Sequence, residues 1–401
     1  MNKRGSILLL VLVFGSVFFI ILSALAGAVL SESKYQEMLL TKSTSFTIAE
    51  AGLEHYAWFL NRYPTDLQHG TGRPGPYVIP YTDVTGNKLG TFELSVSGTS
   101  ACGTLQSIDI TSKGVSTKNS TIYTTLVGRY ASRSVASYSI ASSSAISSPD
   151  FPSLKTSAQG MGAYFPRLTT PEQPFLGYHL IFNNNGTVSV YKVNTVTVLK
   201  SVKPADGSSF NVTDYSLIAT EEPVQTLPIS SQCGLIFIED NAWIEGIVSG
   251  SVTVVAANLS GSGTGADIII RNNIVKDAAR ALSGITVIAQ HNILIAPDSP
   301  DTIAIQGVFI ASQGTFGRNN FMTPSGGCNG KYEARGTITM TGTVVSSRTP
   351  IVRWKNGCAV GKDAGYQTWN LASDASLAAA PPPFTPYISG IRQFISWQQT
   401  H

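Results

Sequence analysis

A charge-free apolar run near the amino terminus constrains this chain more than any other feature. No charged residue occurs from Ser6 to Leu30. About 20 apolar residues are enough to cross the hydrocarbon core of a bilayer as a helix, and the apolar core of an ordinary secretory signal is shorter, roughly 7–15 residues. The run therefore predicts a membrane-spanning helix.

The residues before this run set its orientation. Lys3 and Arg4 precede Gly5, and basic residues beside an apolar span favour a cytoplasmic amino terminus. A cleaved signal peptide is an alternative, because residues 23–26 (Ser-Ala-Leu-Ala) are similar to a small-residue cleavage site. A glycine between the basic pair and the apolar run also permits cleavage on the cytoplasmic side, which would leave the whole apolar helix on the mature protein.

The helix is expected to continue beyond the membrane. Apolar residues fall at three- and four-residue steps, which is one stripe of a helix: Phe46, Ala49, Leu53, Tyr56 and Leu60. Glu50 and Glu54 lie off this stripe and are expected on a solvated face. Pro64 disfavours helical geometry at Tyr63. The pattern predicts one helix over residues 6–63, with an apolar half (6–30) and an amphipathic half (31–63).

Two segments resemble a known family. Residues 3–10 (KRGSILLL) and 48–54 (IAEAGLE) are similar to the leader and the following helix of type IV pilin-like proteins, especially PilX-type minor pilins. The resemblance implies that residues 1–5 are a leader, with Lys3 and Arg4 as its charges. It also implies that a prepilin peptidase cuts after Gly5 and that the new terminus, Ser6, is methylated.

The chain departs from the major-pilin pattern at one position. Major pilins carry a glutamate at mature position five, where this chain has Leu10. In the family, that carboxylate compensates the terminal ammonium of a neighbouring subunit inside the apolar filament core, where an unpaired charge is costly. The resemblance therefore implies a subunit that is used sparingly, such as one near a filament tip.

The composition of the chain limits the classes of partner that we expect it to bind. Charged residues make up 13% of the 401 residues, against roughly 25% in typical soluble domains. The formal charge is +3, of which Lys3 and Arg4 supply two. No basic stripe occurs, so we expect no specific nucleic-acid partner.

Alternating apolar and polar residues predict strands after the helix. In residues 64–131 they predict a small sheet, and the resemblance implies that it is the pilin-like antiparallel sheet that covers the helix stripe. Residues 132–160 are rich in Ser and Ala and are interpreted as a linker or an extended crossing strand. A hairpin is predicted at residues 183–186 (Asn-Asn-Asn-Gly). Short apolar runs separated by Gly and Asn recur through residues 161–401 and favour a β-solenoid, with a β-sandwich as the alternative. The predicted fold class is α+β, mostly β.

The four cysteines form no CxxC pair, so we expect neither a zinc site nor any other metal or cofactor. Cys328 and Cys358 each lie in a glycine-containing turn beside a predicted strand, and we predict that they form a disulfide, which over about 30 residues would contribute roughly 3–4 kcal/mol. Pairing of Cys102 with Cys233 stays open.

No catalytic constellation is apparent. The five histidines are scattered, and residues 261–265 (Gly-Ser-Gly-Thr-Gly) lack the lysine of a phosphate-binding loop. Glu239, Asp240 and Glu245 are acidic enough for a glycosidase pair, but strand alternation separates them, and solvated turn residues are expected instead. Asp298 and Asp301 are interpreted as turn residues. We therefore expect no enzyme activity.

These observations predict a minor pilin or pseudopilin of a type IV pilus or a related secretion system. Its partners would be other pilin or pseudopilin subunits, the prepilin peptidase, the membrane, and a surface or cell ligand. The single-pass chain would keep its amino terminus in the cytoplasm and present a β-rich extracytoplasmic head, in a surface filament, for assembly priming or adhesion. The alternatives are a membrane-anchored β-solenoid that acts on polysaccharide and an anchored surface-binding protein that does not assemble.

Overall fold

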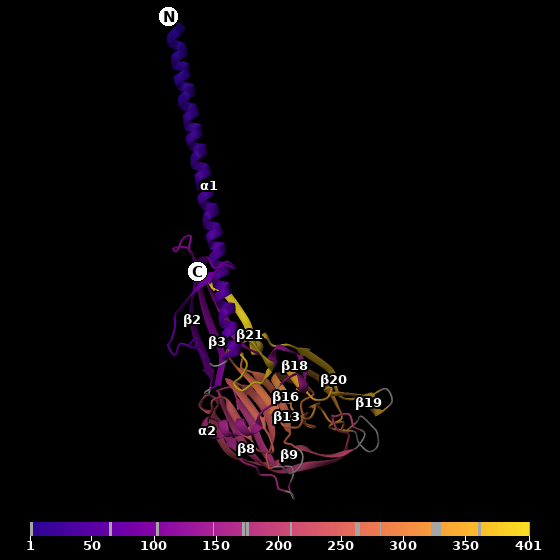
Figure 1. The fold of residues 1–401 in the computed structure, drawn as a ribbon. Coiled ribbons are helices and arrows are strands. Elements are labelled where there is room, and N and C mark those ends of the chain that lie inside the picture. Colours follow the sequence, from indigo (N-terminus) through magenta and orange to yellow (C-terminus); the bar gives the residue numbers. More distant parts are fainter. Residues whose placement is uncertain are drawn as a thin grey trace. The chain divides into compact units, whose positions relative to one another are not determined.

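The computed structural model describes residues 3–63, 66–101, 104–146, 148–170, 173, 176–208, 211–260, 265–280, 282–321, 330–359 and 362–400. The chain forms two compact units. Unit 1 comprises Met1–Ser100, Leu105–Ala131 and Arg392–His401, and unit 2 comprises Ala101–Thr104 and Ser132–Ile391. Figure 1 shows the ribbon of the whole chain.

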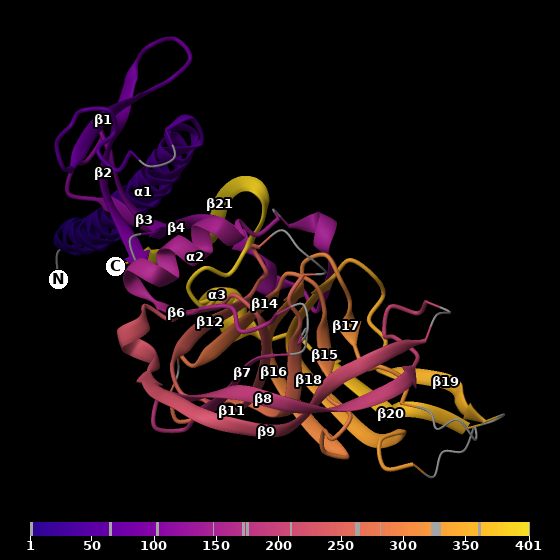
Figure 2. The ribbon, with the colours of Figure 1, turned by 90° about the horizontal axis from the view of Figure 1, so that it is seen from below.

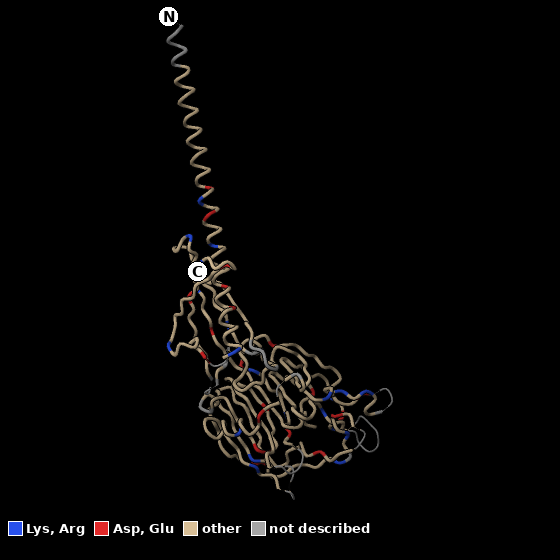
Figure 3. Tube along the Cα trace, in the orientation of Figure 1, with Lys and Arg blue, Asp and Glu red and all other residues tan. Residues whose placement is uncertain are grey.

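Unit 1 begins with one uninterrupted helix, α1 (Lys3–Arg62), which confirms the predicted long helix. Its apolar part is exposed from Leu10 to Leu30. In Figure 3 this part of the helix carries no blue or red residue. Within the described residues, α1 is the one helix that is long and apolar enough to cross a membrane.

The sheet of unit 1 has five strands in the order β1-β2-β3-β4-β21. Its members are β1 (Tyr77–Thr82), β2 (Lys88–Ala101), β3 (Thr104–Ser116), β4 (Tyr123–Ser134) and β21 (Tyr387–Thr400). The pairs β1/β2 and β3/β4 are antiparallel. The first four strands match the predicted sheet. The fifth is a difference from the prediction, because it comes from the carboxyl end of the chain.

The carboxyl half of α1 packs on this sheet. The predicted stripe is buried at Ala49, Leu53, Tyr56 and Leu60, while Glu50 and Glu54 are exposed as predicted. These side chains contact an apolar sheet face formed by Phe92, Leu94, Ile108 and Ile110. Each fully buried leucine or isoleucine contributes roughly 1.5–3 kcal/mol, so this face holds the helix on the sheet.

Unit 2 is a β-solenoid with antiparallel additions. Its strands are β5 (Ile140–Ser142), β6 (Ala163–Phe165), β7 (Gly177–Asn183), β8 (Thr187–Val202), β9 (Val212–Pro228), β10 (Leu235–Ile238), β11 (Asn241–Val248), β12 (Ser251–Ala256), β13 (Ile268–Lys276), β14 (Gly284–Ala289), β15 (Ile293–Ile295), β16 (Thr302–Ala311), β17 (Phe316–Gly317), β18 (Ala334–Ser346), β19 (Arg353–Ala359) and β20 (Lys362–Ala372). Figure 2 shows successive strands lying side by side.

Parallel pairing distinguishes the solenoid from the sandwich. One face is formed by β6, β10, β12 and β14, all parallel, and by the carboxyl ends of β16 and β18. A second face stacks the start of β11 on β13, β15 and β17. A third stacks the end of β13 on the start of β16, then β18 and β20. The three faces enclose an apolar interior.

Glycines allow β16 and β18 to turn from one face to the next. Gly307 in β16 and Gly342 in β18 have φ angles of +151° and +130°, which side-chain-bearing residues rarely adopt. The two glycines are partners in the parallel register. A methyl group on Gly342 would overlap the backbone of Gly307. Both strands therefore bend at the same corner because both lack a side chain there.

Residues 132–160 do not form the expected linker or crossing strand. They contain β5 and begin α2 (Phe151–Met161), whose first turn is capped by the Asp150 side chain. Phe151 and Ala158 contact the outer surface of the first solenoid face, where Leu235 and Phe237 are buried. Because β10 is apolar on both sides, its outer surface needs such a cover. Leu377 of α3 (Ala375–Ala379) completes the cover.

The predicted hairpin is confirmed. It joins β7 to β8 through residues 184–186, with Gly186 at a φ of +86°. β8 continues antiparallel to β9. Val193 of this hairpin packs on Trp243 and Ile269, which point outward from the second solenoid face. The hairpin thereby covers one end of that face.

Candidate binding groove

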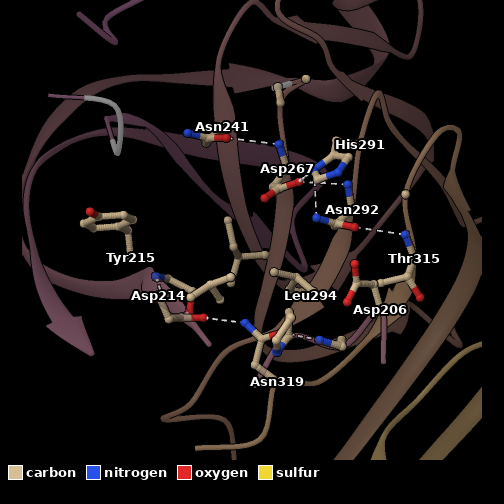
Figure 4. Close-up of a pocket in the computed structure, with 18 of the residues that line it drawn as sticks. Asp206, Asp214, Tyr215, Asn241, Asp267, His291, Asn292, Leu294, Thr315 and Asn319 are labelled. Atoms are coloured by element: carbon tan, nitrogen blue, oxygen red, sulfur yellow. Dashed lines mark hydrogen bonds and ion pairs between the residues drawn. The ribbon is translucent and has the colours of Figure 1, made fainter. Parts of the chain in front are cut away.

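A groove of about 520 Å³ lies in unit 2, along the second solenoid face. Its lining comes from the corner where the first face turns into the second, from the outward side chains of β11, β13 and β15, and from residues within 204–208 and 212–216 opposite them. Figure 4 shows these walls.

A ladder of polar side chains forms the corner wall. Asn241, Asp267, Asn292 and Thr315 occupy equivalent places in successive coils, because the residues that follow them pair in register. Each side-chain oxygen accepts a hydrogen bond from the backbone amide one coil further: Asp267 N to Asn241 Oδ1 at 3.0 Å, Asn292 N to Asp267 Oδ1 at 2.8 Å, and Thr315 N to Asn292 Oδ1 at 2.9 Å. The ladder satisfies corner amides that no strand pairs.

His291 adds an ionisable group to this wall. Its Nδ1 lies 2.9 Å from Asp267 Oδ1. The hydrogen bond to Asp267 raises the pKa of His291 above its usual 6.5, and partial burial opposes this effect. The imidazole is about one-third exposed and is therefore accessible from the groove.

The floor of the groove is apolar. Trp243, Ile269 and Leu294 are register partners on β11, β13 and β15 and line the cavity. Trp243 is almost completely buried, and its Nε1 donates to Ser216 O at 2.6 Å. Leu294 is half-buried. The open part of the floor therefore centres on Leu294, next to the polar ladder (Figure 4).

The opposite wall is held in place by Asn319. Its Nδ2 donates to Asp214 Oδ2 at 2.7 Å, and its Oδ1 accepts from Ala205 N at 2.7 Å. Asp214 also accepts from Ser216 N at 2.9 Å. Burial raises the pKa of Asp214, although these donors oppose the shift. Two segments of the wall are thus tied to one amide side chain.

Charged groups at the groove are engaged within the protein. Asp206 forms an ion pair with Arg348 at 2.6 Å. Asp240 accepts hydrogen bonds from the backbone amides of Leu168 and Thr169 at 2.8 and 2.7 Å. Arg167 donates to Asn258 Oδ1 at 3.2 Å. The groove thus presents no concentrated charge of either sign.

The three acidic residues considered in the sequence lie in separate environments. Glu239 Oε2 lies 2.6 Å from Lys155 Nζ and 2.5 Å from Tyr164 Oη, whereas Asp240 caps backbone amides. The expectation that these residues are solvated was wrong, because Glu239 and Asp240 are buried. Both lie at the turn between β10 and β11, where packing segments supply hydrogen-bond donors.

Glu245 belongs to a different cluster, which sequence reasoning missed. His179 is fully buried, and its Nδ1 lies 2.8 Å from Glu221 Oε2. Its Nε2 lies 3.0 Å from Glu245 Oε1. The interaction with His179 is the largest effect on Glu245 and lowers the pKa of its carboxyl group. The cluster joins β7, β9 and β11 and lies outside the groove lining.

The remaining candidate residues are placed as follows. Lys3, Arg4, Gly5 and Ser6 lie in the first turns of α1. Cys233 and Cys358 are each disulfide-bonded. Cys102 and Cys328 lie outside the described residues, so pairing of Cys328 with Cys358 stays a prediction. Residues 261–264 also lie outside them.

The two aspartates interpreted as turn residues contact the third solenoid face. Asp298 lies 3.4 Å from Arg271 Nε, and Asp301 Oδ1 accepts from Gly336 N at 2.8 Å. Within the described part of the chain, no group of three His, Cys, Asp or Glu residues is placed to hold a metal ion.

No protein-family model matches this chain, and no curated protein matches its sequence. Among solved structures, it is similar to the competence-associated pilin ComZ from Thermus thermophilus, with 11% identity. The match covers 90% of this chain and 97% of that one, at a TM-score of 0.27.

Proposed function

We propose that this chain is a minor pilin or pseudopilin, anchored in the cytoplasmic membrane by α1, which presents the β-solenoid of unit 2 for assembly priming or surface adhesion. The observation that carries this proposal is the continuity of α1. One helix, Lys3–Arg62, is apolar and exposed from Leu10 to Leu30 and packs on a sheet from Ile48 to Leu60.

The sequence at the start of α1 supports processing on the cytoplasmic side. Lys3 and Arg4 directly precede Gly5 and the apolar run. Cleavage after Gly5 would leave the exposed apolar segment on the mature protein, with Ser6 as its first residue. A helix that is apolar on all sides needs either lipid or other apolar helices around it, and a filament core of pilin-type subunits would supply the latter.

The test is the mature amino terminus. The full chain is expressed in membranes with and without a prepilin peptidase, and its first residue is identified by mass spectrometry. We expect Ser6 when the peptidase is present, and no cleavage in a Gly5→Val variant. Gly27→Val, at a position with nothing within 4 Å of an added Cβ, is the matched control and should still be cleaved. A mature terminus other than Ser6 would contradict the pilin assignment.

An anchored surface protein that does not assemble is the second candidate, and Leu10 favours it. Major pilins use a carboxylate at this mature position to compensate a neighbouring terminal ammonium, and Leu10 cannot do so. Crosslinking in membranes that also contain the partner pilins distinguishes the two. Crosslinks through the apolar half of α1 support assembly, whereas a chain that is processed yet never crosslinks supports the anchored form.

We also propose that the head is a binding module and not an enzyme. The acidic residues that could serve a glycosidase are separated: Glu239 binds Lys155, and Glu245 binds His179. A carboxylate paired with an ammonium group, as Glu239 is with Lys155, is a poor general acid. Hydrolysis assays of the full chain on polysaccharides should show no turnover, and steady product release would contradict this view.

A further inference from the structure

We propose that the groove of unit 2 binds an uncharged oligosaccharide, laid along β11, β13 and β15. This inference rests on the surface-binding part of the proposed function but not on filament assembly. It assigns the head a class of ligand, and it places the residues that would contact this ligand on two sides of one groove.

The length of the polar wall fits an extended chain. Asn241, Asp267, Asn292 and Thr315 are four consecutive rungs of a parallel stack. Neighbouring strands lie about 4.8 Å apart, so the ladder runs for about 14 Å. A ligand that reached all four rungs would be a short polymer and not a single small molecule.

The groove combines hydrogen-bonding groups with an adjacent apolar strip. The ladder supplies amide, carboxylate and hydroxyl groups, and Leu294 lies beside it on the floor. Among the described residues, Asp267 contacts His291 and the Asn292 amide through Oδ1, and its second carboxylate oxygen is directed across the groove (Figure 4). A sugar ring has hydroxyl edges and a C–H face, which suit a polar wall beside an apolar floor.

An aromatic side chain completes the arrangement from the other side. Tyr215 lines the groove on the wall that faces the ladder, and Figure 4 shows its ring across from Asp267. An aromatic ring offers a flat apolar surface together with a polar hydroxyl. Tyr215 can thus contact the second side of a sugar whose hydroxyl groups reach the ladder.

The charges argue against polyanions. A polymer of phosphates or uronates needs clustered free cations and binds with a steep dependence on salt. Arg348 is paired with Asp206, and His291 is paired with Asp267. Asp214 and Asp240 also line this cavity, and their carboxyl groups accept hydrogen bonds from the protein. The described lining therefore offers no cluster of free cations to an anionic chain, whereas an uncharged ligand needs none.

Binding of defined sugars to the full chain in detergent tests the inference. Maltohexaose, cellohexaose and chitohexaose are the neutral probes, and oligogalacturonate and single-stranded DNA are the anionic ones, each titrated by calorimetry at low and high salt. We expect at least one neutral hexaose to bind with an affinity that does not change with salt. Binding of the anionic probes alone, falling steeply with salt, or binding of no neutral hexaose, would overturn the proposal.

Variants locate the binding. Tyr215→Ala removes the aromatic wall, and Asn292→Ala removes one rung of the ladder, so each should weaken binding about tenfold, as expected for the loss of one good contact. Gln225→Ala, at an exposed position of β9 outside the groove lining, is the control and should bind as the native chain does. Native affinity in both groove variants would overturn the proposal. The assay needs no processing at Gly5, so failure of the pilin assignment would leave this result unchanged.

Discussion

Gly114 of β3 lies against Ala49 of α1 so closely that a methyl group on the glycine would come within 3.0 Å of the Ala49 Cα. Such a methyl group would also overlap the Ser45 carbonyl oxygen. The contact is backbone against backbone, and neither side can move without shifting the helix or the strand. The closeness of the helix to the sheet therefore depends on this glycine.

Replacement of Gly114 by alanine should destabilise unit 1. Overpacking typically costs about 1–3 kcal/mol, and we expect the upper part of this range because the obstructing atoms are backbone atoms. Guanidinium unfolding of the full chain in detergent, followed by hydrogen exchange in α1 and β3, measures the effect. Gly160→Ala in α2 is the control, because its Cβ would meet nothing within 4 Å. Equal stability of the two variants would contradict the packing described for Gly114.

Loss of the Asn319 side chain should loosen the groove wall. In an Asn319→Ala variant, Ala205 N and the buried Asp214 carboxylate each lose a partner. An unsatisfied buried polar group costs about 1–3 kcal/mol, so we expect a loss of roughly 2–4 kcal/mol in the unfolding free energy of unit 2 and faster hydrogen exchange over residues 204–208 and 212–216. Exchange at native rates in those segments would show that Asn319 does not hold the wall.

Trp243→Phe isolates one hydrogen bond. The variant keeps an aromatic ring in the buried site but removes the donor to Ser216 O. We expect a loss of about 1–2 kcal/mol, because a buried carbonyl is left unpaired. Trp243→Ala should cost about 3–5 kcal/mol through the cavity that it creates. Denaturant unfolding compares the two variants, and equal losses would assign the whole effect to packing.

The His291–Asp267 pair should stabilise the protein most at acidic pH. The pKa of His291 is raised in the folded state. Its contribution is therefore fully present below the unfolded value of about 6.5 and is lost as the pH rises through the folded pKa. The stability difference between the native chain and His291→Gln should be larger at pH 5.5 than at pH 8.5. A difference that grows toward alkaline pH would refute this assignment.

Glu245 should show the opposite dependence. Its pKa is lowered in the folded state, chiefly by the interaction with His179. Its contribution is present above the unfolded value of about 4.5 and is lost as the pH falls through the folded pKa. The unfolding free energies of the native chain and of Glu245→Gln should therefore converge as the pH falls below the folded pKa. Glu93→Gln, on an unrelated strand of unit 1, serves as the control for the loss of one carboxylate.

Some of this structure could be predicted from the sequence, because the spacing of apolar residues indicates which side chains are buried. The stripe through Leu53 and Leu60 identified the face of α1 that meets the sheet, and the Gly186 turn identified a hairpin. The same spacing does not indicate which other element a buried face packs against. Phe394 lies on β21 at the carboxyl end of the chain, and nothing local in the sequence assigns this strand to the first sheet. The Ser- and Ala-rich segment before α2 is similar to a linker, although the apolar outer surface of β10 requires it as a cover.

The groove was harder to predict for the same reason. Asn241, Asp267, Asn292 and Thr315 each stand alone before a short apolar run, at irregular spacing. The available signal was a polar residue directly before each such run. This signal identifies a row of side chains only if the strands are parallel and in register, because that pairing brings residues far apart in sequence together. His179 and Glu245 are in contact for the same reason, because the fold places their strands next to each other and the sequence does not show this pairing.

The main segment of unit 2, Ser132–Ile391, is inserted between β4 and β21, which are neighbours in the sheet of unit 1. This segment is consequently connected to unit 1 at both of its ends. A pulling force on the segment would be divided between two adjacent strands of the sheet, so neither strand would carry the whole load. A single proteolytic cut in either connection would also leave the segment joined to unit 1 through the other.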